Sequence, residues 1–144
     1  MATRFSDIYT RAIFRFADYK FLEQDIATRE SVLEKYLISA KADFQRICKV
    51  DLTDCDFETK QFNNDLGDEA IEILALGIAY YWISYKTLNS ELLKNFLNSK
   101  DFYYYSPANL LKEIQTLRET IRDEFNSKMR QYSYFDNSIS TLKN

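Results

Sequence analysis

An acid-rich segment, residues 51–65 (DLTDCDFETKQFNND), holds the side chains best suited to binding a metal ion. Its acids fall at the first, third, fifth and twelfth positions of a calcium-binding loop: Asp54, Asp56, Glu58 and Asp65. That template needs glycine at its sixth position and a longer, bidentate glutamate at its twelfth, where this chain has Thr59 and Asp65. We therefore predict a polar loop, without a metal, that Phe57 and Phe62 attach to the core.

A second pair of acids, Asp68 and Glu72, shares one helix face and could serve acid–base catalysis. Acids in the first turn of a helix more commonly stabilise the helix dipole, and we interpret the pair in that way. The chain has no histidine, the commonest general base and transition-metal ligand. Its only glycines, Gly67 and Gly77, cannot form a phosphate-binding loop. The sequence thus predicts no enzymatic activity, no catalytic residue, no metal and no cofactor.

The composition is that of a globular protein with many aromatic residues. Hydrophobic residues make up 46% of the 144 residues and charged residues 28%, which is typical of one folded domain. Eleven Tyr and eleven Phe stand against two Gly and one Pro, and so few turn formers favour a small number of long helices. A net charge of -3 argues against general binding of nucleic acid, and the first residues lack a signal-peptide pattern, so we expect a cytoplasmic protein.

Apolar residues recur at helical spacing over most of the chain. Ser106 and Pro107 form a strong helix start, because a proline at the first helical position loses no intrahelical hydrogen bond. Periodicity is absent from residues 51–65 and 131–144. We predict an all-α bundle of about four to five helices with an extended, perhaps strand-like, C-terminal tail. The expected helices cover residues 5–16, 28–48, 66–88, 89–99 and 107–130.

Residues 73–85, ILALGIAYYWISY, carry no charge over thirteen positions. As a helix they would span about 20 Å, which is short of the roughly 30 Å of a membrane's hydrocarbon core. A helix that is apolar on every side must then be surrounded by protein. Gly77 in its middle predicts a close approach of another backbone, since glycine otherwise weakens a helix.

Two groups of aromatic and apolar residues are candidates for contact with other polypeptides, because interfaces favour such residues. We divide the chain into a helical domain, residues 1–130, and an extension, residues 131–144, that docks on a partner. The extension has five candidate anchors: Tyr132, Tyr134, Phe135, Ile139 and Leu142. The candidates for contact between subunits are Trp82, Tyr103, Tyr104 and Tyr105.

Four stretches carry a resemblance to a known family: FSDIYTRAIFRFADYKFLE, DFQRICKVDLTD, EAIEILALGIAYYWISYKTLNSELL and YYYSPANLLKEIQTLR. Together they resemble the head-to-tail connector, or adaptor, proteins of long-tailed bacteriophages and related prophage particles. None of the four is a catalytic signature. The resemblance rests on overall likeness along essentially the whole chain.

The resemblance implies a helical virion protein that assembles as a ring, typically a dodecamer, beneath the portal at the capsid vertex. Such a ring joins capsid to tail and lets DNA pass without binding it specifically. It implies three protein partners: copies of the chain itself, the portal protein and a tail-side neck protein. Three alternatives remain open: another neck protein (a stopper or tail-completion protein), a cytoplasmic helical module that regulates or binds a partner, and a metal-dependent enzyme that uses the acids at 54 to 65.

Overall fold

The structure is a computed structural model that describes residues 2–15, 25–88 and 107–142. These residues are mostly helical, which confirms the expected fold class. In chain order they form β1 (Thr3–Arg4), α1 (Phe5–Arg15), α3 (Ile26–Gln45), β2 (Cys55–Asp56), β3 (Gln61–Phe62), α4 (Asp68–Leu88) and α6 (Pro107–Leu142). The helix expected at residues 89–99 lies outside the described residues.

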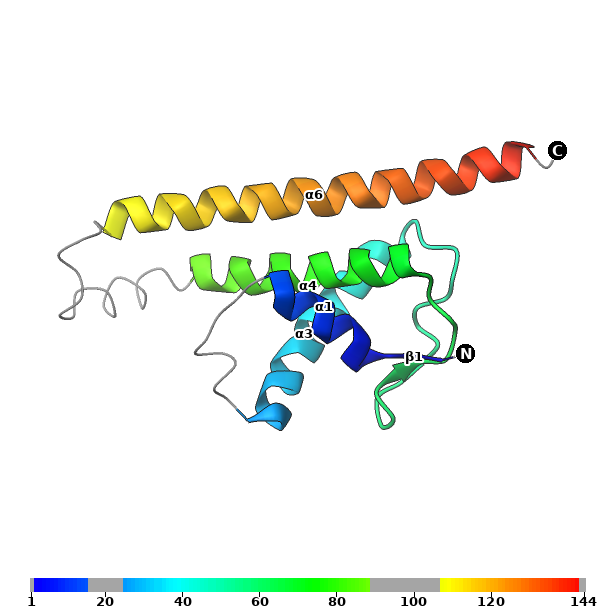
Figure 1. The fold of residues 1–144 in the computed structure, drawn as a ribbon, viewed down its shortest axis with the longest axis horizontal. Helices are drawn as coiled ribbons and strands as arrows, with labels where there is room; N and C mark the ends of the chain where they lie inside the picture. Colours follow the sequence, from blue (N-terminus) through cyan, green and yellow to red (C-terminus); the bar gives the residue numbers. More distant parts are fainter. Residues whose placement is uncertain (1, 16–24, 89–106, 143–144) are drawn as a thin grey trace.

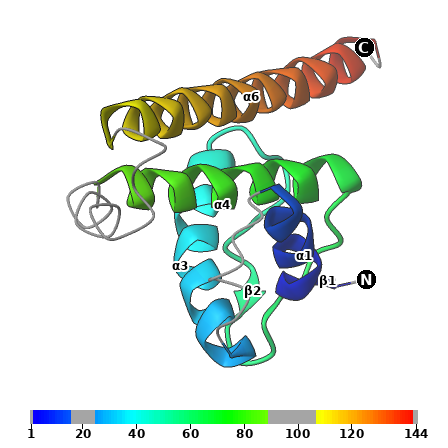
Figure 2. The same cartoon turned by 60° about the vertical axis from the view of Figure 1, so that its left-hand side comes forward.

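Helix α4 is the centre of the molecule, because α1, α3 and α6 all pack against it. Helix α6 runs alongside α4 on one side, while α1 and α3 lie on the other side (Figures 1 and 2). Every residue from 73 to 79 is buried, and this burial on all sides explains why the stretch carries no charge. Among the described residues, no helix is both long enough and apolar enough to cross a membrane.

The close backbone approach expected at Gly77 is confirmed. A Cβ atom built at Gly77 would lie 2.5 Å from Cβ of Ala40 and 3.1 Å from Cζ of Phe125. Helix α3 therefore reaches α4 at a contact that leaves no room for a methyl group, and α6 closes the same point from the other side. Glycine is required here by packing rather than by backbone conformation.

A small antiparallel sheet, absent from the expected fold, holds the segment between α3 and α4. Its strand order is β1-β3-β2, and Thr3 and Cys55 both pair with Phe62. Oγ1 of Thr3 accepts a hydrogen bond of 2.9 Å from the backbone N–H of Leu66. The rings of Phe5 and Phe62 meet edge to face with 5.0 Å between their centroids. Strands of two residues have no alternating pattern to detect, so the sequence did not reveal them.

Helix α6 continues through residue 130 to Leu142, so the structure assigns helix to residues 131–142, which were expected to be extended. Tyr132, Phe135, Ile139 and Leu142 follow one another at steps of three, four and three, which is helical spacing. They also continue the series that begins with Ile121, Phe125 and Met129. Polar residues between these positions concealed the pattern. The boundary expected between residues 130 and 131 therefore falls within an unbroken helix.

Candidate interaction surfaces

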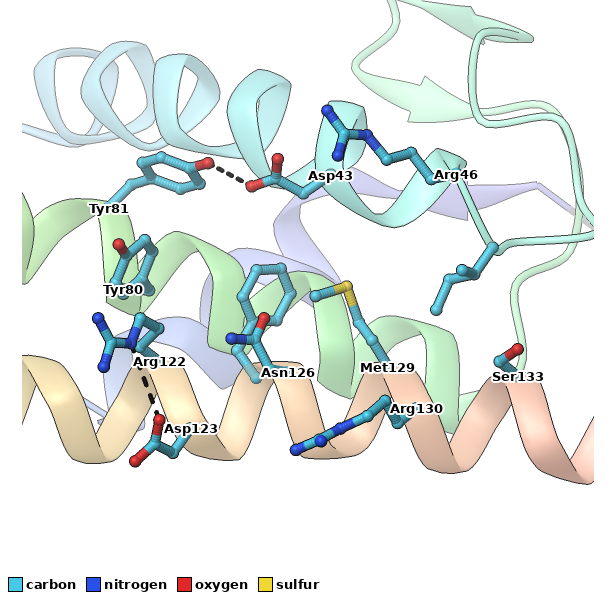
Figure 3. A pocket seen from close by; sticks show the side chains of 12 residues that line it. Asp43, Arg46, Tyr80, Tyr81, Arg122, Asp123, Asn126, Met129, Arg130 and Ser133 are labelled. Atoms are coloured by element: carbon cyan, nitrogen blue, oxygen red, sulfur yellow. Dashed lines mark hydrogen bonds and ion pairs between the residues drawn. The ribbon is translucent and has the colours of Figure 1, made fainter.

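A groove of about 690 Å³ lies between α3 and α6, with α4 as its floor (Figure 3). Asp43 of α3 borders it, together with Arg46 and Ile47 in the turn directly after the helix. Helix α6 contributes a face whose members recur every three or four residues, among them Arg122, Asn126, Met129, Arg130 and Ser133. The groove lies where α3 and α6 both pack on α4.

Aromatic side chains of α4 form the inner part of the groove. The ring of Tyr80 stacks on Phe125 with 6.4 Å between the centroids, and the guanidinium of Arg118 lies 5.5 Å from the centroid of the Tyr80 ring. Nη2 of Arg118 also donates a hydrogen bond of 3.3 Å to the hydroxyl of Tyr80, and its Nε donates one of 3.0 Å to Ser84. These contacts fix the floor as a rigid, largely aromatic surface.

The hydroxyl of Tyr81 donates a hydrogen bond to the carboxylate of Asp43 and so connects α4 to α3. Burial, followed by the hydrogen bond and negative charge of Asp43, raises the pKa of Tyr81 above its ordinary value. The phenol therefore remains a protonated donor at neutral pH. Its role here is to hold the wall of the groove, and an attacking or proton-accepting group would need the opposite shift.

Three arginines on the rim give the groove a positive edge. Arg46, Arg122 and Arg130 are all exposed. Within the described ranges Arg122 meets only the neighbouring Asp123, at 3.8 Å, and neither Arg46 nor Arg130 forms an ion pair. The groove thus offers free guanidinium groups around an apolar floor, a combination suited to binding an acidic segment with an apolar side chain.

The predicted anchors of the C-terminal extension differ in their surroundings. Tyr132 packs on Phe44, with 5.0 Å between ring centroids and a tilt of 74°, and its hydroxyl lies 3.7 Å from Sγ of Cys48. Tyr132 therefore attaches α6 to α3 within the same chain. Tyr134 is 71% exposed. Phe135, Ile139 and Leu142 lie further along α6 in register with Tyr132.

The candidates for contact between subunits are only partly described. Trp82 is half-buried on α4 and packs against the core. Tyr103, Tyr104 and Tyr105 lie outside the described residues. The structure therefore brings Trp82 into the body of the domain and does not bear on the tyrosine cluster.

The acids considered for catalysis belong to an ion-pair cluster that joins three helices. Nη2 of Arg11 lies 2.9 Å from Asp68, and Arg15 contacts both Glu72 of α4 and, at 2.9 Å, Glu124 of α6. Burial disfavours the charged form of Glu72, but hydrogen bonds and charge from Arg15 and Arg11 outweigh it and lower its pKa. A carboxylate held in this way is a structural group rather than a proton donor.

The acids of residues 51–65 bind their own loop. Asp56 accepts hydrogen bonds from the backbone N–H groups of Glu58 and Thr59, and Asp54 accepts one of 2.8 Å from the amide of Asn63. In the part of the chain that the structure describes, no three acidic, cysteine or histidine side chains gather as metal ligands would. This arrangement orders a tight turn and leaves its outer carboxylate surface exposed.

Sequence reasoning missed the groove, because its residues come from three helices and each looks like part of a solvated face. The only local signal was the repeat of polar residues at 122, 126, 130 and 133 on one side of α6.

The chain matches no known protein-family model, and no curated protein or solved structure is significantly similar to it.

Proposed function

We propose that this chain is a structural virion protein that forms a ring beneath a phage portal, joins capsid to tail and continues the DNA channel. Its partners are then copies of itself, the portal protein and a tail-side neck protein. The place of action is the neck of the particle, after assembly in the host cytoplasm. The proposal starts from the sequence resemblance to adaptor proteins, and three features of the molecule support it.

The supporting feature of greatest weight is the length of α6. It has 36 residues against 21 in α4, so at 1.5 Å per residue it outreaches the central helix by about 22 Å. Part of α6 consequently lies beyond the body that α4 organises (Figure 1). A projecting helix with apolar positions at 135, 139 and 142 is suited to insertion into a partner.

Exposed apolar side chains provide the second feature. Phe14 is 84% exposed and Ile26 is 64% exposed, and both are large residues on the helical body. Single exposed residues of this kind are common, but here they accompany Tyr134 and the projecting helix. The third feature is the groove, which offers a second surface of different chemistry. A ring subunit needs at least two distinct contact surfaces to join a neighbour on each side.

Binding to the portal tests the proposal directly. The chain without residues 135–144, mixed with cognate portal rings and sedimented, should stay in the supernatant while the full chain pellets with the rings. Truncation after Tyr134 retains the contact between Tyr132 and Phe44, so the helical domain should keep its circular dichroism spectrum and melting temperature.

A substitution pair provides the matched control. Phe135→Ser combined with Ile139→Ser and Leu142→Ser should also abolish co-sedimentation, whereas Ser138→Ala with Thr141→Ala, at other positions of the same turns, should not. A truncated chain that still pellets with portal rings would count against portal attachment through this helix. A full chain that binds a preformed connector ring but no portal would favour the stopper or tail-completion alternative.

A further inference from the structure

The turn between β2 and β3 presents acids around a partly exposed aromatic ring. Residues 51–65 contain five acids and one lysine, and Nζ of that lysine, Lys60, lies 2.9 Å and 3.0 Å from the two carboxylate oxygens of Glu34. The positive charge of the segment is thereby matched within the chain. Asp54 and Glu58 are exposed, and Phe57 between them is 42% exposed. The segment is therefore acidic and apolar at once.

The groove between α3 and α6 has the complementary chemistry. Arg46 and Arg130 stand on its opposite walls without an ion pair among the described residues, and Phe125 and Met129 of α6 line the groove beside the tyrosines of α4. An acidic segment with one aromatic side chain would match both parts of this surface, because bidentate arginine–carboxylate pairs are among the stronger polar contacts. DNA is a poorer match, because Asp43 and Asp123 line the groove beside its arginines, and the groove therefore lacks the set of unpaired cations that a row of phosphates requires.

The position of the turn excludes insertion into the groove of the same copy. The turn lies on the side of α4 away from α6 in both views (Figures 1 and 2), whereas the groove is bordered by α6. The C-terminal part of α6 is a weaker candidate occupant, because residues 131–142 carry one charge, Asp136, and cannot pair with several arginines. Contact between two different surfaces of identical chains is head-to-tail, and a head-to-tail contact generates a ring when its rotation closes.

We propose that the β2–β3 turn of one copy docks in the α3–α6 groove of the next copy, with Asp54 and Glu58 pairing with Arg46 and Arg130 and Phe57 covering the groove floor. This contact is the proposed interface between neighbouring subunits of the ring, and the inference rests on the proposed function. It assigns a role to strands β2 and β3, which flank the turn, while Lys60 anchors the turn to Glu34 of α3. It also explains why Arg46 and Arg130 form no ion pair among the described residues of one chain.

Charge reversal on either surface tests the contact. The groove variant is Arg46→Glu with Arg130→Glu, and the turn variant is Asp54→Lys with Glu58→Lys. In sedimentation velocity, each variant alone should remain monomeric at concentrations at least tenfold above those at which the wild-type chain assembles. An equimolar mixture should assemble again, because each altered turn then meets an altered groove and each native turn meets a native groove. Circular dichroism establishes that both variants are folded.

The matched control is Lys112→Glu with Glu119→Lys, which reverses two exposed charges of α6 outside the groove and should leave assembly unchanged. If either variant alone assembles like the wild type, or if the mixture stays monomeric, the proposed contact is overturned while the ring itself stands. If the wild-type chain forms no oligomer at any concentration, either alone or in the presence of portal rings, both the proposed ring and this contact are contradicted.

Discussion

At the scale of single residues, Gly77 and Ala40 form a close contact between α4 and α3. Gly77→Ala places a methyl group 2.5 Å from Cβ of Ala40, so one helix must move. We expect a net loss of about 1–3 kcal/mol in the free energy of unfolding, in spite of the better helix propensity of alanine. Urea denaturation of the purified variant measures this loss.

A double-mutant cycle separates the steric cause from other effects of the Gly77 substitution. Ala40→Gly removes the opposing methyl group, so Gly77→Ala should cost less in that background than in the wild type. Gly67→Ser is the matched control, because a side chain at Gly67 meets nothing within 4 Å and serine is favoured at a helix N-cap. Equal costs in both backgrounds would show that the two positions are not in conflict.

Glu72 gives the fold a dependence on pH. Its folded-state pKa lies below the ordinary value of 4.5, so its ion pairs contribute fully above that pH and lose their contribution as the pH falls through the folded value. Glu72→Gln should therefore destabilise the protein by about 1 kcal/mol at pH 7, and the difference from wild type should vanish in more acidic solution. Chemical denaturation at several pH values measures the difference.

The control for Glu72 is Glu119→Gln, which neutralises an exposed acid of α6. It should change stability by a few tenths of a kcal/mol at most, because isolated surface charges contribute little. A Glu72→Gln effect that stayed constant from pH 7 to pH 3 would contradict an origin in the ion pairs of Arg11 and Arg15.

At the scale of elements, α6 packs on α4 through side chains that include the buried Ile121 and Phe125. Phe125 is 3% exposed and contacts Tyr80 and the Gly77 site, so Phe125→Ala should destabilise the fold by about 3–5 kcal/mol. Phe14→Ala is the matched control, because that ring is 84% exposed and its loss should cost little. Thermal melts of the two variants compare the costs, and equal melting temperatures would show that α6 is not held through this ring.

The sequence predicted the existence of these elements better than their limits. Helices α1, α3 and α4 lie where the apolar spacing placed them, and α6 begins at Pro107 as expected. The pattern failed at Tyr132, where intervening polar residues hid steps of three and four. It also failed at Thr3 and Phe62, whose pairing depends on residues far apart in the chain and has no local signature.

Local sequence patterns predicted the candidate surfaces less well than they predicted the helices. Aromatic content suggested contact with other polypeptides, yet Tyr132 proved to pack on Phe44 of its own chain. The groove could not be predicted, because Arg46 and Arg130 come to border one groove only when α3 and α6 have both packed on α4. Local patterns identify a helix face, whereas a surface shared by three helices depends on how those faces are arranged in space.

At the scale of the whole molecule, the balance of acidic and basic residues influences how strongly a ring would bind the DNA that passes through it. The chain has 22 acidic and 19 basic residues, and Asp43 and Asp123 line the groove together with its arginines. Retention of DNA needs a set of cations that displaces counterions from the phosphates, and a channel through which DNA moves should lack one. The proposed conduit and the formal net charge of -3 are therefore compatible.

We predict that the wild-type chain shows no binding to double-stranded DNA in fluorescence anisotropy at about 150 mM salt, where proteins with many phosphate contacts still bind. The comparison is the Asp54→Lys, Glu58→Lys variant, whose net charge is higher by four. This variant should bind double-stranded DNA weakly at low salt. Its binding should weaken steeply as salt is added, because each phosphate contact releases a counterion. Tight, salt-dependent binding by the wild-type chain would instead indicate that one face of the molecule binds DNA. DNA could then pass through the ring only if that face pointed away from the channel.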